Sequence, residues 1–147
     1  APSTAATPPQ QTNARYDLSK DVAWEAKQLD QLNDLIAFDL SFMEISSQAG
    51  MHALTQKLNP RKKDAQALVV ACNAKLKAAI FRKCAPERLK SSVVAIRDKA
   101  ELVFKLCKYT SQAFITDPES FSTAIAQAET LNIKLPMHFY LHSAILH

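Results

Sequence analysis

The sequence predicts an all-α protein, an antiparallel helical bundle of four main helices followed by a short C-terminal helix. Short links marked by proline and capping residues separate the helical segments, and short links make successive helices antiparallel neighbours. No stretch has the pattern of two strands joined by a turn. Apolar residues recur instead at the i, i+3, i+4, i+7 spacing of a helix, and a clear run is Phe121, Ala124, Ile125 and Ala128.

Five helices are expected, over residues 19–57, 60–83, 86–116, 118–131 and 136–146. Asn59-Pro60 and Asp117-Pro118 each place a capping side chain before a proline, which is typical of a helix start. The first helix would be about 58 Å long and the second only about 36 Å, at 1.5 Å per residue. We therefore expect the first helix to kink or break within residues 46–50, where weak helix formers surround Gly50.

Length and composition indicate one globular domain, residues 16–147, preceded by a flexible tail over residues 1–15. The chain has 147 residues, of which 48% are hydrophobic and 22% charged, and this suffices for a hydrophobic core. The tail is rich in Pro, Thr and Gln and cannot bury enough apolar surface to become ordered.

The opening of the chain suggests a compartment. It begins Ala-Pro-Ser-Thr and not with Met, so we expect a mature periplasmic or secreted protein released from a signal peptide. A lipoprotein that carries a lipid anchor in its full-length form is one alternative, and a trimmed cytoplasmic domain is another. No apolar run approaches the roughly 18 residues that a transmembrane segment needs.

Missing motifs argue against several chemistries. Gly50 is the only glycine, whereas phosphate-cradling loops and dinucleotide-binding turns need several. The sequence motifs of zinc proteases, thiol redox sites, nucleophile elbows and di-iron bundles are absent as well. We expect no enzymatic activity and no cofactor. His138 and His142, four residues apart, are candidate metal ligands, but a lone pair of this kind does not define a metal site.

Asp39 interrupts the apolar stripe of the first predicted helix. If that helix continued, Asp39 would lie in the centre of the stripe, and Ser46 would lie in the same column. Burial of an unpaired carboxylate costs several kcal/mol. We therefore expect a buried polar pair in which Ser46, a basic side chain or a backbone amide holds Asp39, with a ligand-facing acid as the alternative.

Charge is divided unevenly along the chain. Residues 15–56 contain three basic and seven acidic side chains, whereas residues 57–108 contain fourteen basic and four acidic ones. One interpretation is a surface for an acidic partner, formed by the basic residues Arg82, Lys83, Arg88 and Lys90. The other is a solvated pair of helices that the acidic first helix partly neutralises. Nucleic acid is not expected as a partner, because aromatic residues are not interleaved with the basic ones.

The third predicted helix is apolar on two sides. Leu102, Leu106 and Tyr109 form a second stripe, so this helix is either central in the bundle or part of a partner surface. Together with the basic residues, they are the predicted contact surface.

The sequence therefore predicts a non-enzymatic protein that works by protein–protein binding, such as an envelope accessory, inhibitor or immunity-type protein. Its partner would be an acidic protein or a second copy of the chain. The alternative is a carrier that holds a small ligand or a metal in the bundle interior.

We predict that the three cysteines are free thiols. In a hairpin that turns near residue 84, Cys72 lies about 16 Å from Cys107 along the axis and about 18 Å from Cys84. A disulfide requires Cα atoms within about 7 Å. Titration of thiols in denaturant should therefore find three per chain, and a single thiol would show that the hairpin register is wrong.

Overall fold

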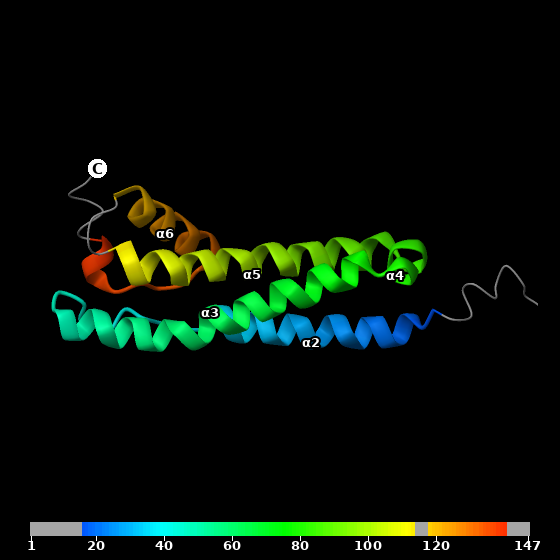
Figure 1. Ribbon diagram of the computed structural model, residues 1–147, viewed down its shortest axis with the longest axis horizontal. Helices are drawn as coiled ribbons and strands as arrows, with labels where there is room; N and C mark the ends of the chain where they lie inside the picture. The colour runs from blue at the N-terminus through cyan, green and yellow to red at the C-terminus, as the bar shows by residue number, and fades with distance from the viewer. Residues whose placement is uncertain (1–15, 114–117, 141–147) are drawn as a thin grey trace, which may run out of the picture.

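A computed structural model describes residues 16–113 and 118–140, and this part of the chain is all-α (Figure 1). The predicted tail, residues 1–15, lies outside the described residues. A helical turn over residues 137–140 follows the last named helix. The named helices are α2 (Leu18–Ile36), α3 (Gln48–Lys77), α4 (Ala79–Cys84), α5 (Glu87–Ala113) and α6 (Pro118–Leu131).

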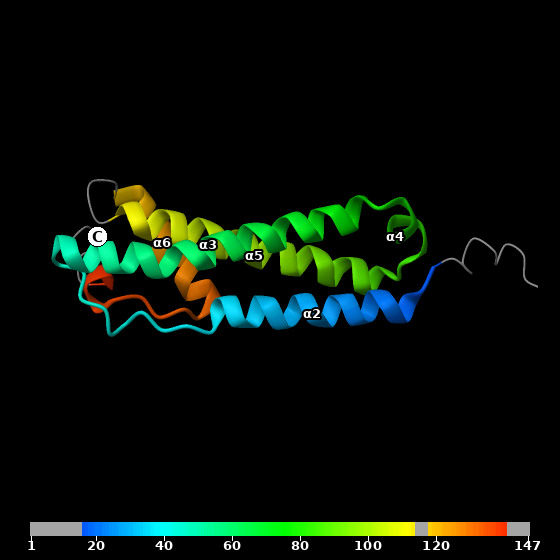
Figure 2. The same ribbon diagram turned by 60° about the horizontal axis from the view of Figure 1, so that its bottom comes forward.

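The long helices pack as an antiparallel bundle, as the sequence predicts. Helices α2, α3 and α5 run side by side in alternating directions, and α6 lies along the C-terminal part of α5 (Figures 1 and 2). The short helix α4 lies at the end of the bundle away from α6, close to the start of α2 (Figure 1). Because α2, α3 and α6 all contact α5, the third predicted helix is central in the bundle.

This central position corrects part of the predicted contact surface. Leu106 is only 1% exposed and belongs to the hydrophobic core, so it is not available to a partner. Leu102 and Tyr109 are half-buried and pack against the same core. The second apolar stripe of α5 is therefore largely used inside the bundle.

The first predicted helix, residues 19–57, is wrong in its extent. The helix ends at Ile36, residues 37–47 form a connection, and α3 begins at Gln48. Leu40 explains the early end, because its side chain is fully buried and its N–H donates to the Lys134 carbonyl at 2.8 Å. The connection thus runs beside the segment that follows α6 (Figure 2).

The predicted burial of Asp39 and Ser46 is also wrong, because both residues are exposed. The Ser41 N–H donates to Asp39 Oδ1 at 2.8 Å, and hydrogen bonding from Ser41 holds the pKa of the Asp39 carboxyl below its usual value. Helical spacing places a side chain only where the helix continues, and here it has ended. The buried polar or charged residues are instead Asp21, Glu25, Gln28 and Thr110.

Pro60 does not begin a helix as predicted but lies inside α3. Proline removes the hydrogen bond to the carbonyl of Gln56, but both residues are exposed, so water can reach that carbonyl. The buried stripe continues at helical spacing on both sides of Pro60 and holds the two halves in one helix. Its residues are Leu54, Leu58, Ala65, Leu68 and Cys72.

The remaining boundaries agree better with prediction. The expected helix over 60–83 is interrupted at Ala78, which has an extended backbone, and α4 follows it. The expected helix over 86–116 corresponds to α5 as far as Ala113, beyond which residues 114–117 are outside the described part. The prediction for residues 118–131 matches α6.

Arg61 fixes the C-terminal end of α2 on α3. Its Nη1 donates to the carbonyls of Asp34 at 2.9 Å and Leu35 at 3.2 Å, and its guanidinium lies 4.1 Å from the ring centroid of Phe38. Since α2 has no basic residue in its last turn, Arg61 supplies the positive charge that stabilises a helix C-terminus.

Gly50 occupies a crowded position in the first turn of α3. Its N–H donates to the Oγ of Ser47, the N-cap residue, at 3.0 Å. A Cβ at this position would overlap the carbonyl oxygen of Glu44, which is backbone and cannot move aside easily. The approach of the preceding connection to the helix therefore requires glycine here.

We predict that Gly50→Ala destabilises the protein by about 2 kcal/mol, because the clash outweighs the gain of about 1 kcal/mol in helix propensity. Urea unfolding of the variant measures the change. Ala49→Gly, at an exposed position beside it, should cost about 1 kcal/mol or less. A higher unfolding midpoint for Gly50→Ala would contradict the close approach.

Candidate functional site

The N-terminal half of α2 turns a polar face toward the bundle. Asp21, Glu25 and Gln28 are each less than 10% exposed. Of the apolar residues in this part of α2, Leu18, Val22 and Leu29 are exposed, whereas Trp24 is half-buried and packs against the core. Here α2 is therefore held by charged and polar groups together with Trp24, whereas an amphipathic helix usually turns a mainly apolar face to the core.

The first of these attachments is an ion pair between α2 and α3. Lys75 Nζ donates to Asp21 Oδ1 at 2.8 Å. The same ammonium lies 4.7 Å from the ring centroid of Trp24 and 5.8 Å from that of Phe81. Burial, together with the neighbouring Asp21 carboxylate, raises the pKa of Tyr16 to about 12. Lys75 is thus satisfied inside the fold by a carboxylate and two aromatic faces.

The second attachment joins α2 to α5. Arg88 Nη1 lies 3.4 Å from Glu25 Oε2. The side chain of Glu25 is 8% exposed, whereas that of Arg88 is 66% exposed. Arg88 therefore contacts α2 through Nη1, while most of its side chain remains accessible to a partner.

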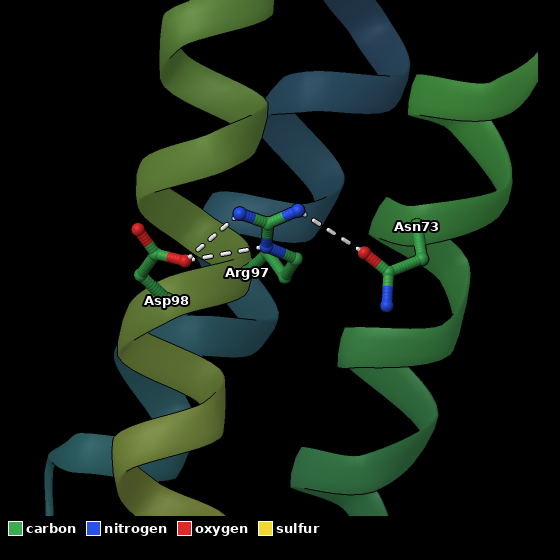
Figure 3. Close-up of polar contacts among 3 residues, drawn as sticks. All are labelled: Asn73, Arg97 and Asp98. Atoms are coloured by element: carbon green, nitrogen blue, oxygen red, sulfur yellow. Dashed lines mark hydrogen bonds and ion pairs between the residues drawn. The ribbon is translucent and has the colours of Figure 1, made fainter.

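Arg97 is a further cation used inside the fold. Its Nη1 donates to Asn73 Oδ1 on α3 at 3.3 Å, and its Nε and Nη2 each donate to Asp98 Oδ1 at 3.2 Å. Figure 3 shows the guanidinium reaching between α5 and α3. This arrangement links the two helices and leaves little of the charge of Arg97 for a partner.

Five basic residues gather where α3, α4 and α5 meet, at one end of the bundle (Figure 1). We call them the basic tip: Lys77, Arg82, Lys83, Arg88 and Lys90. Lys90 pairs with Glu87 at 3.5 Å. Lys77, Arg82 and Lys83 are exposed, and within the described residues they form no hydrogen bond or ion pair.

Helix α4 determines how the basic tip is presented. Phe81 is 1% exposed and anchors this six-residue helix in the core. Helical geometry then turns Lys83 outward and places Ile80 and Arg82 on the two flanks. Ile80 is 41% exposed, so the tip combines unpaired cations with an apolar side chain.

The predicted residues Arg82, Lys83, Arg88 and Lys90 lie on α4 and in the first turn of α5, at this end of the bundle. Sequence reasoning missed Lys77 and Ile80, because the extended backbone at Ala78 separates α3 from α4 and turns α4. It also missed Glu25, whose contact with Arg88 spans 63 positions of the chain. The net charge of residues 57–108 does not show which cations are paired within the fold and which are unpaired.

A second group of basic residues, near residue 60, is partly used internally. Lys57 Nζ lies 5.5 Å from the ring centroid of Phe42, and Arg61 caps α2. A surface cleft of about 650 Å³ opens between α2 and α3 here. Its walls carry Asp34 and Asp64 as well as Lys57 and Arg61, so their charges balance and favour neither cations nor anions.

The predicted metal ligands and the thiols do not form a site in the described part of the chain. His138 is half-buried, His142 lies outside the described residues, and among the described residues no three potential metal ligands gather. All three cysteines are free. Burial raises the pKa of Cys72 to about 11 and that of Cys107 to about 12, so both stay protonated at neutral pH.

Comparison with known proteins found no family model, no curated protein and no solved structure that matches the chain. None of the helices in the described segments is long and apolar enough to cross a membrane. The geometry of the basic tip is therefore the main basis for a functional proposal.

Proposed function

We propose that the protein is a non-enzymatic binding module whose basic tip docks an acidic segment of another protein. The observation that carries the proposal is the set of three exposed cations, Lys77, Arg82 and Lys83, that have no internal partner. Arg61, Lys75 and Arg97 of the same basic region are used by the fold itself, whereas these three neighbouring cations at the end of the bundle are not.

A protein partner fits the tip better than nucleic acid does. Single-stranded nucleic acid is bound by basic grooves that also offer exposed aromatic rings for stacking. At the tip, Phe81 is buried and Trp24 is half-buried against Lys75. The remaining feature, an exposed Ile80, instead suits an apolar side chain of a polypeptide.

A membrane surface is also a poorer fit. Helices that lie on membranes present a long apolar face below a row of basic residues. Helix α4 has six residues, and its exposed large hydrophobic residue is Ile80. A short acidic segment with one apolar side chain matches both the charge and the size of this surface.

We predict that Arg82→Glu/Lys83→Glu lowers the affinity for an acidic peptide of Glu, Asp and Leu by about tenfold. Reversal of exposed charge should act mainly on the association rate and reduce its dependence on salt. Arg88 is left unchanged, since a glutamate there would face Glu25 and disturb the fold. Fluorescence anisotropy and stopped-flow binding at low and high salt measure both effects.

The matched control is Lys99→Glu/Lys105→Glu, which makes the same change in net charge on exposed positions of α5 outside the tip. It should reduce affinity much less. An equal loss in both variants would contradict a localised site. Tighter binding of the wild-type protein to duplex DNA or to anionic vesicles than to the peptide would contradict a protein partner.

A further inference from the structure

We propose that α2 is an internal competitor for the basic tip, in which Glu25 occupies the Arg88 that an acidic partner would bind. This inference rests on the proposed function and concerns its regulation. An acidic partner gains the full use of Arg88 only when the Glu25–Arg88 pair opens.

The competition follows from the chemistry of the two surfaces. Asp21 and Glu25 are four residues apart on one face of α2, and they contact Lys75 of α3 and Arg88 of α5. Helix α2 therefore presents carboxylates to the basic helices, as the proposed partner would. Of the two cations, Lys75 is enclosed by Trp24 and Asp21, whereas Arg88 lies at the border between α2 and the exposed tip.

The geometry of the pair allows it to open. The distance of 3.4 Å is long for a charged hydrogen bond, and Arg88 is 66% exposed. Because Arg88 is exposed, solvent screens its attraction to Glu25, and we expect opening of the pair to shift the affinity for a partner by up to about fivefold. Because the Glu25 carboxylate is only 8% exposed, it must reach water when the pair opens, and the opening should therefore loosen the N-terminal half of α2. Binding of a partner to Arg88 then weakens the attachment of α2 to α5, and the attachment of α2 weakens the binding of the partner by the same factor.

The test compares Glu25→Gln with Glu87→Gln, using the acidic peptide as the probe. Both variants remove one negative charge near the tip, but Glu87 is exposed and pairs with Lys90 in place of Arg88. We expect Glu25→Gln to bind the peptide about threefold to fivefold more tightly, and Glu87→Gln to change the affinity much less. In an Arg88→Gln background, the gain from Glu25→Gln should disappear.

Two results would overturn the inference while leaving the proposed function intact. One is an equal gain from Glu25→Gln and Glu87→Gln, which would indicate only long-range charge. The other is a gain from Glu25→Gln that persists without Arg88. A wild-type protein that fails to bind the peptide would overturn the proposed function as well. Circular dichroism and the urea midpoint of Glu25→Gln establish that the variant is folded.

Discussion

The attachment of the N-terminal half of α2 by charge is the interaction that connects the arrangement of the bundle to its candidate site. Asp21 and Glu25 face inward and reach cations on two different helices, so they fix α2 against both α3 and α5. The acidic helix thereby neutralises part of the basic pair beside it. The cations that α2 does not reach, among them Arg82 and Lys83, remain for the surface. The uneven distribution of charge along the chain thus determines both how α2 is attached and which cations stay exposed.

The two ends of α2 are held in different ways, and the difference has energetic consequences. At the C-terminal end, Leu32 and Leu35 are buried and Arg61 caps the last carbonyls. At the N-terminal end, Trp24 packs only partly against the core, the ion pairs of Asp21 and Glu25 supply the other contacts, and the desolvation of buried charge offsets much of their attraction. Regions with few buried apolar contacts open at lower free energy than the core. We therefore expect the N-terminal half of α2 to be the least stable of the long helical segments.

The sequence was sufficient for the fold class because helical spacing and short links are local signals. Residues 118–131 were predicted with their observed bounds, since Asp117-Pro118 marks a start and the apolar pattern is regular. The end of α2 was missed because it depends on the burial of Leu40 and on its backbone hydrogen bond to Lys134, more than 90 positions away. The prediction of a helix start at Pro60 was wrong because it used local rules alone, whereas the buried stripe of α3 continues through Pro60 without a change of spacing.

The candidate site was predicted only in outline, and for a comparable reason. The position of Arg82 and Lys83 in a basic stretch is a property of the sequence, but whether a cation has a partner is a property of the fold. Arg88 illustrates this limit, because its partner Glu25 comes from a distant helix. Leu106 illustrates the converse, since an apolar side chain on a second stripe of α5 proved to be part of the core.

Amide hydrogen exchange of α2, compared with α3 and α5 at low and high salt, tests the attachment by charge most directly. Salt screens ion pairs but does not weaken apolar packing. The account predicts that amides in the N-terminal half of α2 exchange faster than those of α3 and α5, and that salt accelerates the exchange of α2 alone. Equal protection of the three helices, with no effect of salt on α2, would contradict it.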